Sequence, residues 1–387
     1  MSTIHFNDSL KAKNLWPEKT NENWKYFNFK NFELSTNSIE LNAFQPKIIF
    51  TESTDHEIKI TNSDIFISSN LKDLIKVSII KSCSIKNSES KLDFRMTSLN
   101  LENVGIKIFI QDQKKLNINL VYENSILESS LNPLVVLDIK NSEVNIFESD
   151  MSESKTLLCL HSQIILNHSK LNHVFVMGYQ NSKIINSEVS LENQSHYNQA
   201  SFMIKNQFLR FQQNVALRSE KCEAHLASFN ISDEKTFSEL RTEVLHLEPK
   251  SISRQLFKTI VSDESQSVFN GRVFVDSKAQ KTDSAQLCQG LILSPRAEIN
   301  AKPELEIYAD DVKASHGAAI GQLGKDQIFY LVSRGISPEM AYKILAHAFA
   351  GEVISKIESL ETRKKCQNIL EHSSGAIFEK LAESYRS

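Results

Sequence analysis

The chain has 387 residues and a formal net charge of −3, from 44 basic and 47 acidic residues. This near balance excludes a strong positive field, so neither a polynucleotide nor an anionic membrane is an expected partner. The first residues lack the pattern of a secretory signal, and no apolar run approaches the ~20 residues that span a bilayer. We therefore expect a soluble, cytoplasmic protein.

The five cysteines do not form a recognisable framework. They are scattered, odd in number, and no two of them form a CxxC pair. A disulfide scaffold and a closed zinc site are therefore not expected, and we predict ordinary buried thiols in a reducing compartment. The positions are Cys83, Cys159, Cys222, Cys288 and Cys366.

The first two thirds of the chain predict very short strands joined by tight turns. Stretches such as "IKITNSDIFISSN" and "NSKIINSEVSLEN" alternate a few apolar residues and are bounded by Asn-Ser or His-Ser pairs. Glycine is scarce here, because eight of the 10 glycines lie at or after Gly271. We expect Asn, Asp, Ser and His to make the turns, since Asn and Asp tolerate left-handed backbone.

The same alternation returns between residues 267 and 311. Short strands that recur at roughly 15 to 20 residue intervals favour a β-solenoid, in which each rung stacks on its neighbour. The alternative is a β-sandwich, which typically has longer strands and clearer hairpin turns. The breaks predicted between these strands are Asn270-Gly271, Ser294-Pro295 and Lys302-Pro303.

The stretch "DDVKASHGAAIGQLGKD", residues 310–326, invites comparison with a phosphate-binding loop. Such a loop needs a glycine five residues before its Gly-Lys pair and a hydroxyl after the lysine. Here Ala319 and Asp326 occupy those two positions, and a carboxylate would repel phosphate. Nucleotide binding at this stretch is therefore not expected.

Three helices are predicted after Gln322, where the apolar period changes. The first, "KDQIFYLVSRG", ends at Gly335, and the second begins with Ser337 as its cap and Pro338 in its first turn. The third is expected from about residue 361 to 384, with Leu370, Ile377 and Leu381 as its apolar positions. The second helix carries an apolar stripe of Ala341, Ile344, Leu345, Ala348, Phe349 and Val353.

The apolar stripe of the second helix has two interpretations. It could pack within the helical end-piece itself, or part of it could dock a partner.

Four stretches carry a resemblance to a known family. They are "SVFNGRVFV", "AQKTDSAQ", "LILSPRAEINAKPELEIYADDVKASHGAAIGQL" and "FYLVSRGIS", and they run nearly continuously from about residue 255 to 337. This region resembles the SufB/SufD family of iron–sulfur cluster assembly scaffold proteins. The N-terminal "NENWKYFNF", around Trp24, Lys25 and Tyr26, resembles the entry segment of the SufD branch.

The resemblance implies a mainly β protein, with a right-handed parallel β-helix core at residues 51–322. An N-terminal, partly helical region (1–50) and a C-terminal helical region (323–387) would flank this core. It also implies pairing with SufB through the β-helix ends and binding of the ATPase SufC through the C-terminal helices. The chain would be a non-catalytic scaffold that binds no cofactor stably by itself, with a transient iron–sulfur cluster or iron at the SufB–SufD interface.

His316 is the candidate metal ligand. Alternation places Leu305, Ile307 and Ala309 on one strand face, and we expect His316 at the end of the last strand, just before Gly317 lets the chain leave the solenoid. In the family this histidine is the candidate cluster-linked residue, and neutral imidazole suits iron. The alternative is a histidine that hydrogen-bonds a backbone carbonyl.

The chain departs from its relatives two residues before the histidine. Many of them have cysteine there, whereas this sequence has Ala314, so thiolate ligands would come mainly from the partner. The residues expected on the SufB side are Glu304, Glu306, Tyr308, Asp310 and Lys313. Those expected on the SufC side are Phe329, Arg334, Ile344, Phe349 and Val353. We further expect that removal of residues 336–387 abolishes SufC binding and leaves the β-helix folded.

Two alternative functions remain open from the sequence. A polysaccharide-active β-helix enzyme would need clustered acids for proton transfer, and Glu304 and Glu306 suggest such a cluster. The non-functional interpretation is that these two residues lie on a solvated strand face. A SufB-like scaffold is the second alternative, which the Trp-Lys-Tyr segment and the missing thiol disfavour.

Overall fold

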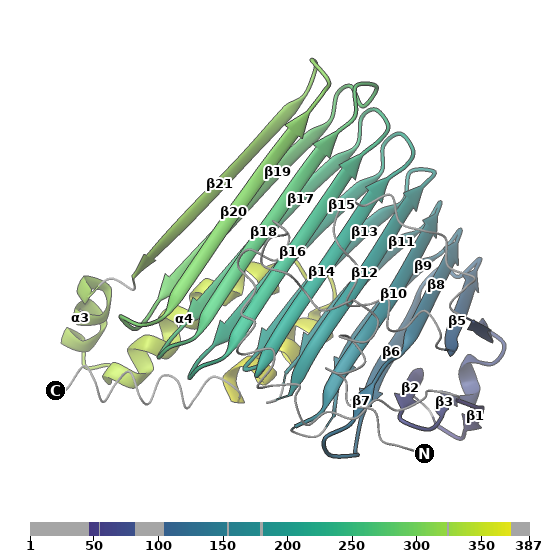
Figure 1. Cartoon of the computed structure of the whole chain (residues 1–387), viewed down its shortest axis with the longest axis horizontal. Helices are drawn as coiled ribbons and strands as arrows, with labels where there is room; N and C mark the ends of the chain where they lie inside the picture. Colours follow the sequence, from purple (N-terminus) through teal and green to yellow (C-terminus); the bar gives the residue numbers. More distant parts are fainter. Residues whose placement is uncertain are drawn as a thin grey trace, which may run out of the picture.

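The computed structural model describes residues 46–53, 55–81, 104–152, 155–178, 181–322 and 325–372. Within these ranges the strands form two sheets, stacked in chain order as Figure 1 shows. From β10 onward, successive strands alternate between the sheets, and each pairs in parallel with the strand two places before it. The predicted parallel β-helix is confirmed, while Trp24 and most of the predicted N-terminal region lie outside the described residues.

The first sheet has 11 strands and the second has 10. Two neighbouring pairs near the N-terminal end, β2–β3 and β4–β5, are antiparallel. The first sheet contains, in spatial order, β1 (Ile48–Thr51), β3 (Ile65–Ser68), β2 (Glu57–Thr61), β6 (Leu116–Glu123), β9 (Glu143–Asp150), β11 (Lys170–Met177), β13 (His196–Ile204), β15 (Glu223–Ser232), β17 (Ile252–Val261), β19 (Asp283–Ile292) and β21 (Lys313–Gln322). The second sheet contains β20 (Glu298–Ile307), β18 (Gln266–Val275), β16 (Phe237–His246), β14 (Phe208–Leu217), β12 (Ser182–Glu192), β10 (Leu157–Asn167), β8 (Leu134–Lys140), β5 (Val104–Gln111) and β4 (Ile75–Lys81), with β7 (Ser130–Leu131) beside β10. A 3₁₀ turn, η2 (Ser69–Leu71), follows β3.

The inner faces of the two sheets enclose one continuous apolar core. Alternate residues of a strand point to opposite faces. In β11, Leu171 and Phe175 therefore join this core, whereas Val174 and Val176 point outward and belong to a second apolar cluster. The first sheet thus carries apolar residues on both faces, and its outer face also needs a cover.

The strands are longer than the sequence pattern predicted. The predicted Asn-Ser turn at Asn186 and Ser187 lies in the middle of β12, where both side chains are buried. The predicted breaks at Gly271 and Pro303 fall inside β18 and β20. Pro303 is tolerated because β20 is the last strand of its sheet, where a missing N–H need not interrupt a ladder on both sides. Only the break at Ser294 falls between two strands.

Residues in the left-handed backbone conformation make many of the turns, as predicted, but more residue types adopt it than Asn, Asp, Ser and His. Asn141 and His168 have positive φ, in agreement with the expectation. Lys221, Lys250 and Glu234 do as well, and their long side chains gave no turn signal in the sequence. The repeated rung geometry, which imposes the same turn at each level, therefore overrides local preference.

Serine side chains link the turns of successive rungs. The backbone N–H of Ser142 donates to Oγ of Ser169 at 3.2 Å, and the N–H of Ser169 donates to Oγ of Ser195 at 3.1 Å. The first two of these serines are 27 residues apart, which is the length of one rung at this level. The Asn-Ser and His-Ser pairs thus mark rung corners here, because their hydroxyls satisfy backbone donors that the turns leave open.

The first two C-terminal helices lie where they were predicted. α3 (Lys325–Ser333) is followed by Gly335 with φ of +86°, and α4 (Pro338–Ser355) starts after Ser337, whose Oγ accepts from the Met340 N–H at 3.3 Å. Residues 360–372 are also helical, and Ile377 and Leu381 of the predicted third helix lie outside the described residues. Among the described residues, no helix has the length and apolar character needed to span a bilayer.

α4 and the helix at 360–372 cover the outer face of the first sheet. Their apolar residues share one cluster with outward residues of β9 to β17. The members of this cluster that come from α4 and the segment after it are Ala346, Ala350, Val353, Ile354, Ile357, Cys366 and Leu370. The helices therefore pack on the solenoid, which neither interpretation of the apolar stripe had anticipated.

The buried face of α4 differs from the predicted stripe. Ile344 and Ala348 are exposed, whereas Ala346 and Ala350 are buried against the sheet. Small alanine side chains let the helix lie close to a flat strand surface, so the contact selects them over the larger Ile344.

Candidate functional site

β21 is the last strand of the first sheet and pairs only with β19 among the described strands. β20 occupies the same place in the second sheet and pairs only with β18. The last rung therefore ends in two strands whose outer backbone edges are unpaired within the described residues, and such edges are ready to pair with another chain. We call this the open end of the solenoid; α3 lies beside it in Figure 1.

His316 is the fourth residue of β21, and the strand continues through Gly317 to Gln322. The prediction that the strand ends at His316 is therefore wrong. Gly317 is an ordinary strand residue in β21. Its small size still matters little for packing, since a Cβ at Gly317 would meet only Leu287 at an ordinary 3.5 Å.

The His316 side chain is exposed although it stands in the inward-facing register. His316 is paired with Gln286, which is paired with Gln255, which in turn is paired with Leu226 of the inner core. No described strand follows β20 and β21, so no described strand covers the imidazole. No hydrogen bond joins its ring to any described residue, which leaves the backbone-carbonyl interpretation without support in this part of the chain.

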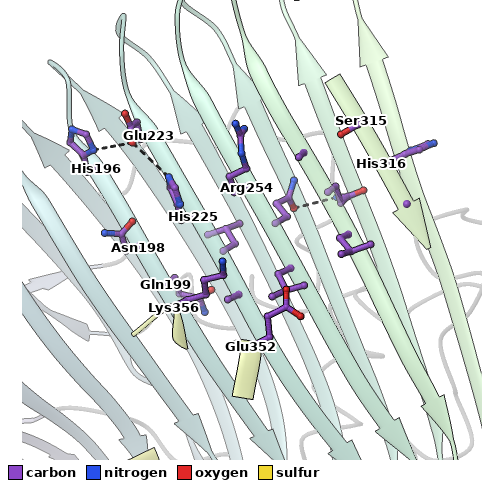
Figure 2. Close-up of a pocket in the computed structure, with 18 of the residues that line it drawn as sticks. His196, Asn198, Gln199, Glu223, His225, Arg254, Ser315, His316, Glu352 and Lys356 are labelled. Atoms are coloured by element: carbon purple, nitrogen blue, oxygen red, sulfur yellow. Dashed lines mark hydrogen bonds and ion pairs between the residues drawn. The ribbon is translucent and has the colours of Figure 1, made fainter. Parts of the chain in front are cut away.

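A groove of about 1010 Å³ runs along the first sheet to β21 (Figure 2). Ser315 and His316 line it at the β21 end, and His196 and His225 flank Glu223 further along. The Nδ1 of His196 and Nε2 of His225 are 3.5 and 3.7 Å from Oε2 of Glu223. Burial lowers the pKa of His225, and the charge of Glu223 opposes this shift.

The C-terminal segment forms the other wall of the groove, where Glu352, Lys356 and Glu358 line it. The Glu358 carboxylate accepts hydrogen bonds from Lys170 at 2.8 Å and from Asn172 at 3.1 Å. These contacts hold the chain after α4 against the edge of the groove. Among the described residues, no three His, Cys, Asp or Glu side chains are grouped to hold a metal ion.

Glu304 and Glu306 of β20 are paired with cations. Glu306 accepts from Nε of Arg272 at 3.0 Å and from the Tyr308 hydroxyl at 2.9 Å, while Glu304 lies 3.1 Å from Nζ of Lys302. The hydrogen bond to Glu306 raises the pKa of the exposed Tyr308 phenol. A general acid must hold a proton that it can donate to the leaving group, whereas these two carboxylates are engaged as partners of neighbouring cations and of a phenol hydroxyl. This arrangement argues against the polysaccharide-active enzyme.

The other residues predicted for the SufB side lie at the corner between β20 and β21. Asp310 is exposed in the turn, and Lys313 is the exposed first residue of β21. The five residues of this predicted set thus lie on the last two strands and their connection, on the same rung as His316.

The residues predicted for the SufC side divide into exposed and buried ones. Phe329 on α3 is 66% exposed, Arg334 is exposed and stacks over a neighbouring tyrosine, and Ile344 on α4 is 39% exposed. Phe349 is partly buried under Lys258, whose Nζ is 4.5 Å from the ring centre. Val353 is 0% exposed against the sheet, so its side chain is not at the surface of this chain.

The sequence motifs can now be compared with known proteins. A family model described as "SUF system FeS cluster assembly, SufBD core domain" matches residues 123–349, which is more than half of the chain. The chain belongs to the SufBD family. The match includes β21 and His316 as well as α3 and most of α4.

Individual relatives agree with the resemblance to the SufD branch. The chain is 40% identical over 153 residues to the Escherichia coli "Iron-sulfur cluster assembly protein SufD", covering 40% of this chain and 36% of the relative. It is 31% identical over 252 residues to the Plasmodium berghei protein of the same name, covering 62% of this chain and 19% of the relative. It is 44% identical over 144 residues to "Protein ABCI7, chloroplastic" of Arabidopsis thaliana, covering 37% of this chain and 30% of the relative. The chain thus matches little more than a third of these relatives' length at most.

The sequence did not reveal the contacts that three residues of this SufBD family member make. Arg272 links Glu243 and Glu306 across neighbouring strands; burial lowers its pKa, but its bonds to Glu306 and the charge of Glu243 raise it overall. Gly271 and Gln286 face each other inside the solenoid. Arg272 and Gly271 lie in the quoted "SVFNGRVFV", but their partners are identified only by strand register, which the sequence pattern did not supply.

The described cysteines are buried and unpaired, as predicted, and Cys83 lies outside the described residues. Burial raises the pKa of Cys159, Cys288 and Cys366 to about 12, which keeps these thiols protonated at neutral pH. A protonated buried thiol is a poor nucleophile and a poor metal ligand. Thiolate ligands for iron therefore have no evident source among these residues.

Proposed function

We propose that this chain is a non-catalytic scaffold subunit of iron–sulfur cluster assembly that pairs with SufB and binds the ATPase SufC. Membership of the SufBD family and the printed names of the SufD relatives support this role. The observation that carries the proposal is the open end of the solenoid, where an exposed imidazole, His316, stands on an unpaired strand.

The open end fits a partner solenoid. β20 and β21 offer unpaired backbone groups, and strand addition to such an edge gives affinity through main-chain hydrogen bonds. Ile307, Tyr308 and Ile320 are exposed apolar side chains on or next to these strands, with Tyr308 60% exposed. Glu304, Glu306, Asp310 and Lys313 add charges that would fix the register of the pair. SufB, a chain of the same family, is the proposed occupant.

The C-terminal helices offer a separate surface for SufC. Phe329, Arg334 and Ile344 are exposed there, and Tyr330 of α3 is exposed as well. Exposed aromatic and arginine side chains are typical anchors of protein interfaces. Val353 supports this surface from below by packing on the sheet, and Phe349 lies at its margin.

The cluster is cargo shared between subunits in this proposal. His316 would supply one nitrogen ligand to iron, and thiolates would come from SufB because Ala314 carries no sulfur. The described residues hold no complete ligand set of their own, so binding would be transient and would require the partner.

Co-expression with SufB and SufC tests the assembly. We expect one complex containing all three chains by size-exclusion chromatography with mass determination. Phe329→Ser with Ile344→Asp should release SufC and retain SufB. The control is Leu360→Ser, which removes an apolar side chain that is 71% exposed but lies outside the predicted set. SufC retention by the double variant at parent strength would refute the assigned surface.

A further inference from the structure

Gln286 has a buried polar atom that no described residue satisfies. The side chain is 2% exposed, and its Nε2 donates to Oε1 of Gln255 at 3.3 Å. That same Oε1 accepts from the Thr242 hydroxyl at 2.9 Å, which orients both amides. The Oε1 of Gln286 is buried without a hydrogen-bond partner in the described part of the chain. Buried acceptors in folded proteins nearly always have a partner, so this atom calls for one.

The opposite sheet makes room for this amide. Gly271 lies in the middle of β18 and faces β19 across the interior. A Cβ at Gly271 would lie 2.3 Å from Nε2 of Gln286, which is closer than any side chain can approach. The missing side chain of Gly271 therefore leaves the space that the Gln286 amide occupies. The sequence had suggested a turn at this glycine.

Gln286 is also the direct strand partner of His316. The two residues are paired in the parallel register of β19 and β21, and both stand in the inward-facing row of the first sheet. Side chains of directly paired residues on one face are neighbours, about 5 Å apart at their bases. The ring of His316 has no hydrogen bond to any described residue, so two directly paired residues carry a donor and a buried acceptor that lack partners in the described part of the chain.

We propose that Gln286 is a positioning residue for His316: its Oε1 accepts a hydrogen bond from one ring N–H and so presents the other ring nitrogen, unprotonated, at the open end. This inference rests on the proposed function, in which His316 binds iron. The hydrogen bond made by one ring nitrogen decides which nitrogen is free to bind metal. Histidine ligands commonly donate their second N–H to an acceptor, and losing that acceptor weakens metal binding roughly 10- to 100-fold. An amide oxygen orients the ring without adding a negative charge.

The ring tautomer of His316 tests the proposal in the isolated full-length chain. With ¹⁵N-labelled histidine at pH 8, where a histidine of ordinary pKa is neutral, the His316 signals are assigned by their loss in His316→Ala. We expect two widely separated ring ¹⁵N shifts in the parent, as in a single tautomer. Gln286→Met, which keeps length and removes the acceptor, should move the two shifts toward each other. Gln286→Glu restores an acceptor and should return the separation.

The matched control is Gln199→Met, which alters the same inner row of the first sheet three strands away from β19. It should leave the His316 shifts unchanged. Unchanged shifts in Gln286→Met, or an equal change in Gln199→Met, overturn the proposal. A second measurement needs no variant: a ring N–H held by a buried acceptor exchanges slowly and gives a resolved proton signal. Complete averaging of that signal with solvent in the parent also overturns it.

The outcome separates this proposal from the proposed function, because the tautomer is read without SufB, SufC or iron. In the complex, Gln286→Met should lower the affinity for iron about 10-fold and Gln286→Glu should restore most of it. If Gln286→Met alters the tautomer while His316→Ala leaves the cluster intact, Gln286 positions the ring but the ring is not a ligand.

Discussion

Val353→Ala tests whether α4 is anchored to the solenoid. Val353 is 0% exposed and packs in the cluster that joins α4 to the outer face of the first sheet. The change removes two methyl groups, at about 0.8 kcal/mol each, and leaves a cavity that the rigid sheet fills poorly. We expect the docked helix to lose about 2 kcal/mol of stability. Ile344→Ala, on the exposed side of the same helix, should cost less than about 0.5 kcal/mol.

Hydrogen exchange of the α4 amides measures this loss locally, because the helix can open without unfolding the solenoid. A loss of about 2 kcal/mol corresponds to roughly 30-fold faster exchange in Val353→Ala. Amides of β14 and β16 in the second sheet serve as an internal reference and should not change. Equal exchange in Val353→Ala and Ile344→Ala would refute the docking. The same contact argues against the expectation that removing residues 336–387 leaves a normal β-helix, since the deletion would expose Phe202 and its apolar neighbours.

Three further predictions concern stability. Lys183 and Asp150 form a fully buried ion pair at 2.9 Å, so Lys183→Met should lower the free energy of unfolding by about 3 kcal/mol, and Asp150→Asn in the same chain should recover part of it in thermal melts. Arg272→Ala removes the guanidinium between Glu243 and Glu306 and should lower the free energy of unfolding by about 2 kcal/mol. Urea unfolding measures this loss, and an unchanged urea midpoint would contradict the bridging role of Arg272. Burial lowers the pKa of His246 to about 4, below its unfolded value of about 6.5, so its stabilising contribution is present above pH 6.5 and is lost as the pH falls toward 4. His246→Asn should flatten that loss in pH-dependent unfolding; an identical pH profile would contradict it.

The alternation of apolar residues was enough to predict the fold class, but not the strand boundaries. Buried polar residues such as Asn186 and Ser187 break the alternation without ending the strand, because neighbouring rungs hold the backbone in register. Gly271 and Pro303 suggested strand breaks that the structure does not have, for the same reason. In a stacked fold, long-range pairing decides what a local pattern leaves ambiguous.

The candidate site was predicted in part. His316 was found through the family motif, and its exposed place on the last rung follows from the end of the strand pattern at Gln322. Its pairing with Gln286 could not be predicted, because the register between strands 30 residues apart depends on every turn between them. The docking face of α4 was missed because the apolar stripe of a helix does not show which residues a flat sheet can approach.

The iron and acid-labile sulfide content of the purified complex with SufB and SufC tests the central claim most directly. His316→Ala is compared with the parent and with His168→Asn, which changes an exposed histidine in a left-handed turn between β10 and β11. We expect all three complexes to keep their size, because an exposed imidazole contributes at most about 1 kcal/mol to stability. Only His316→Ala should lose most of its iron and sulfide. A full cluster content in an intact His316→Ala complex would contradict the account.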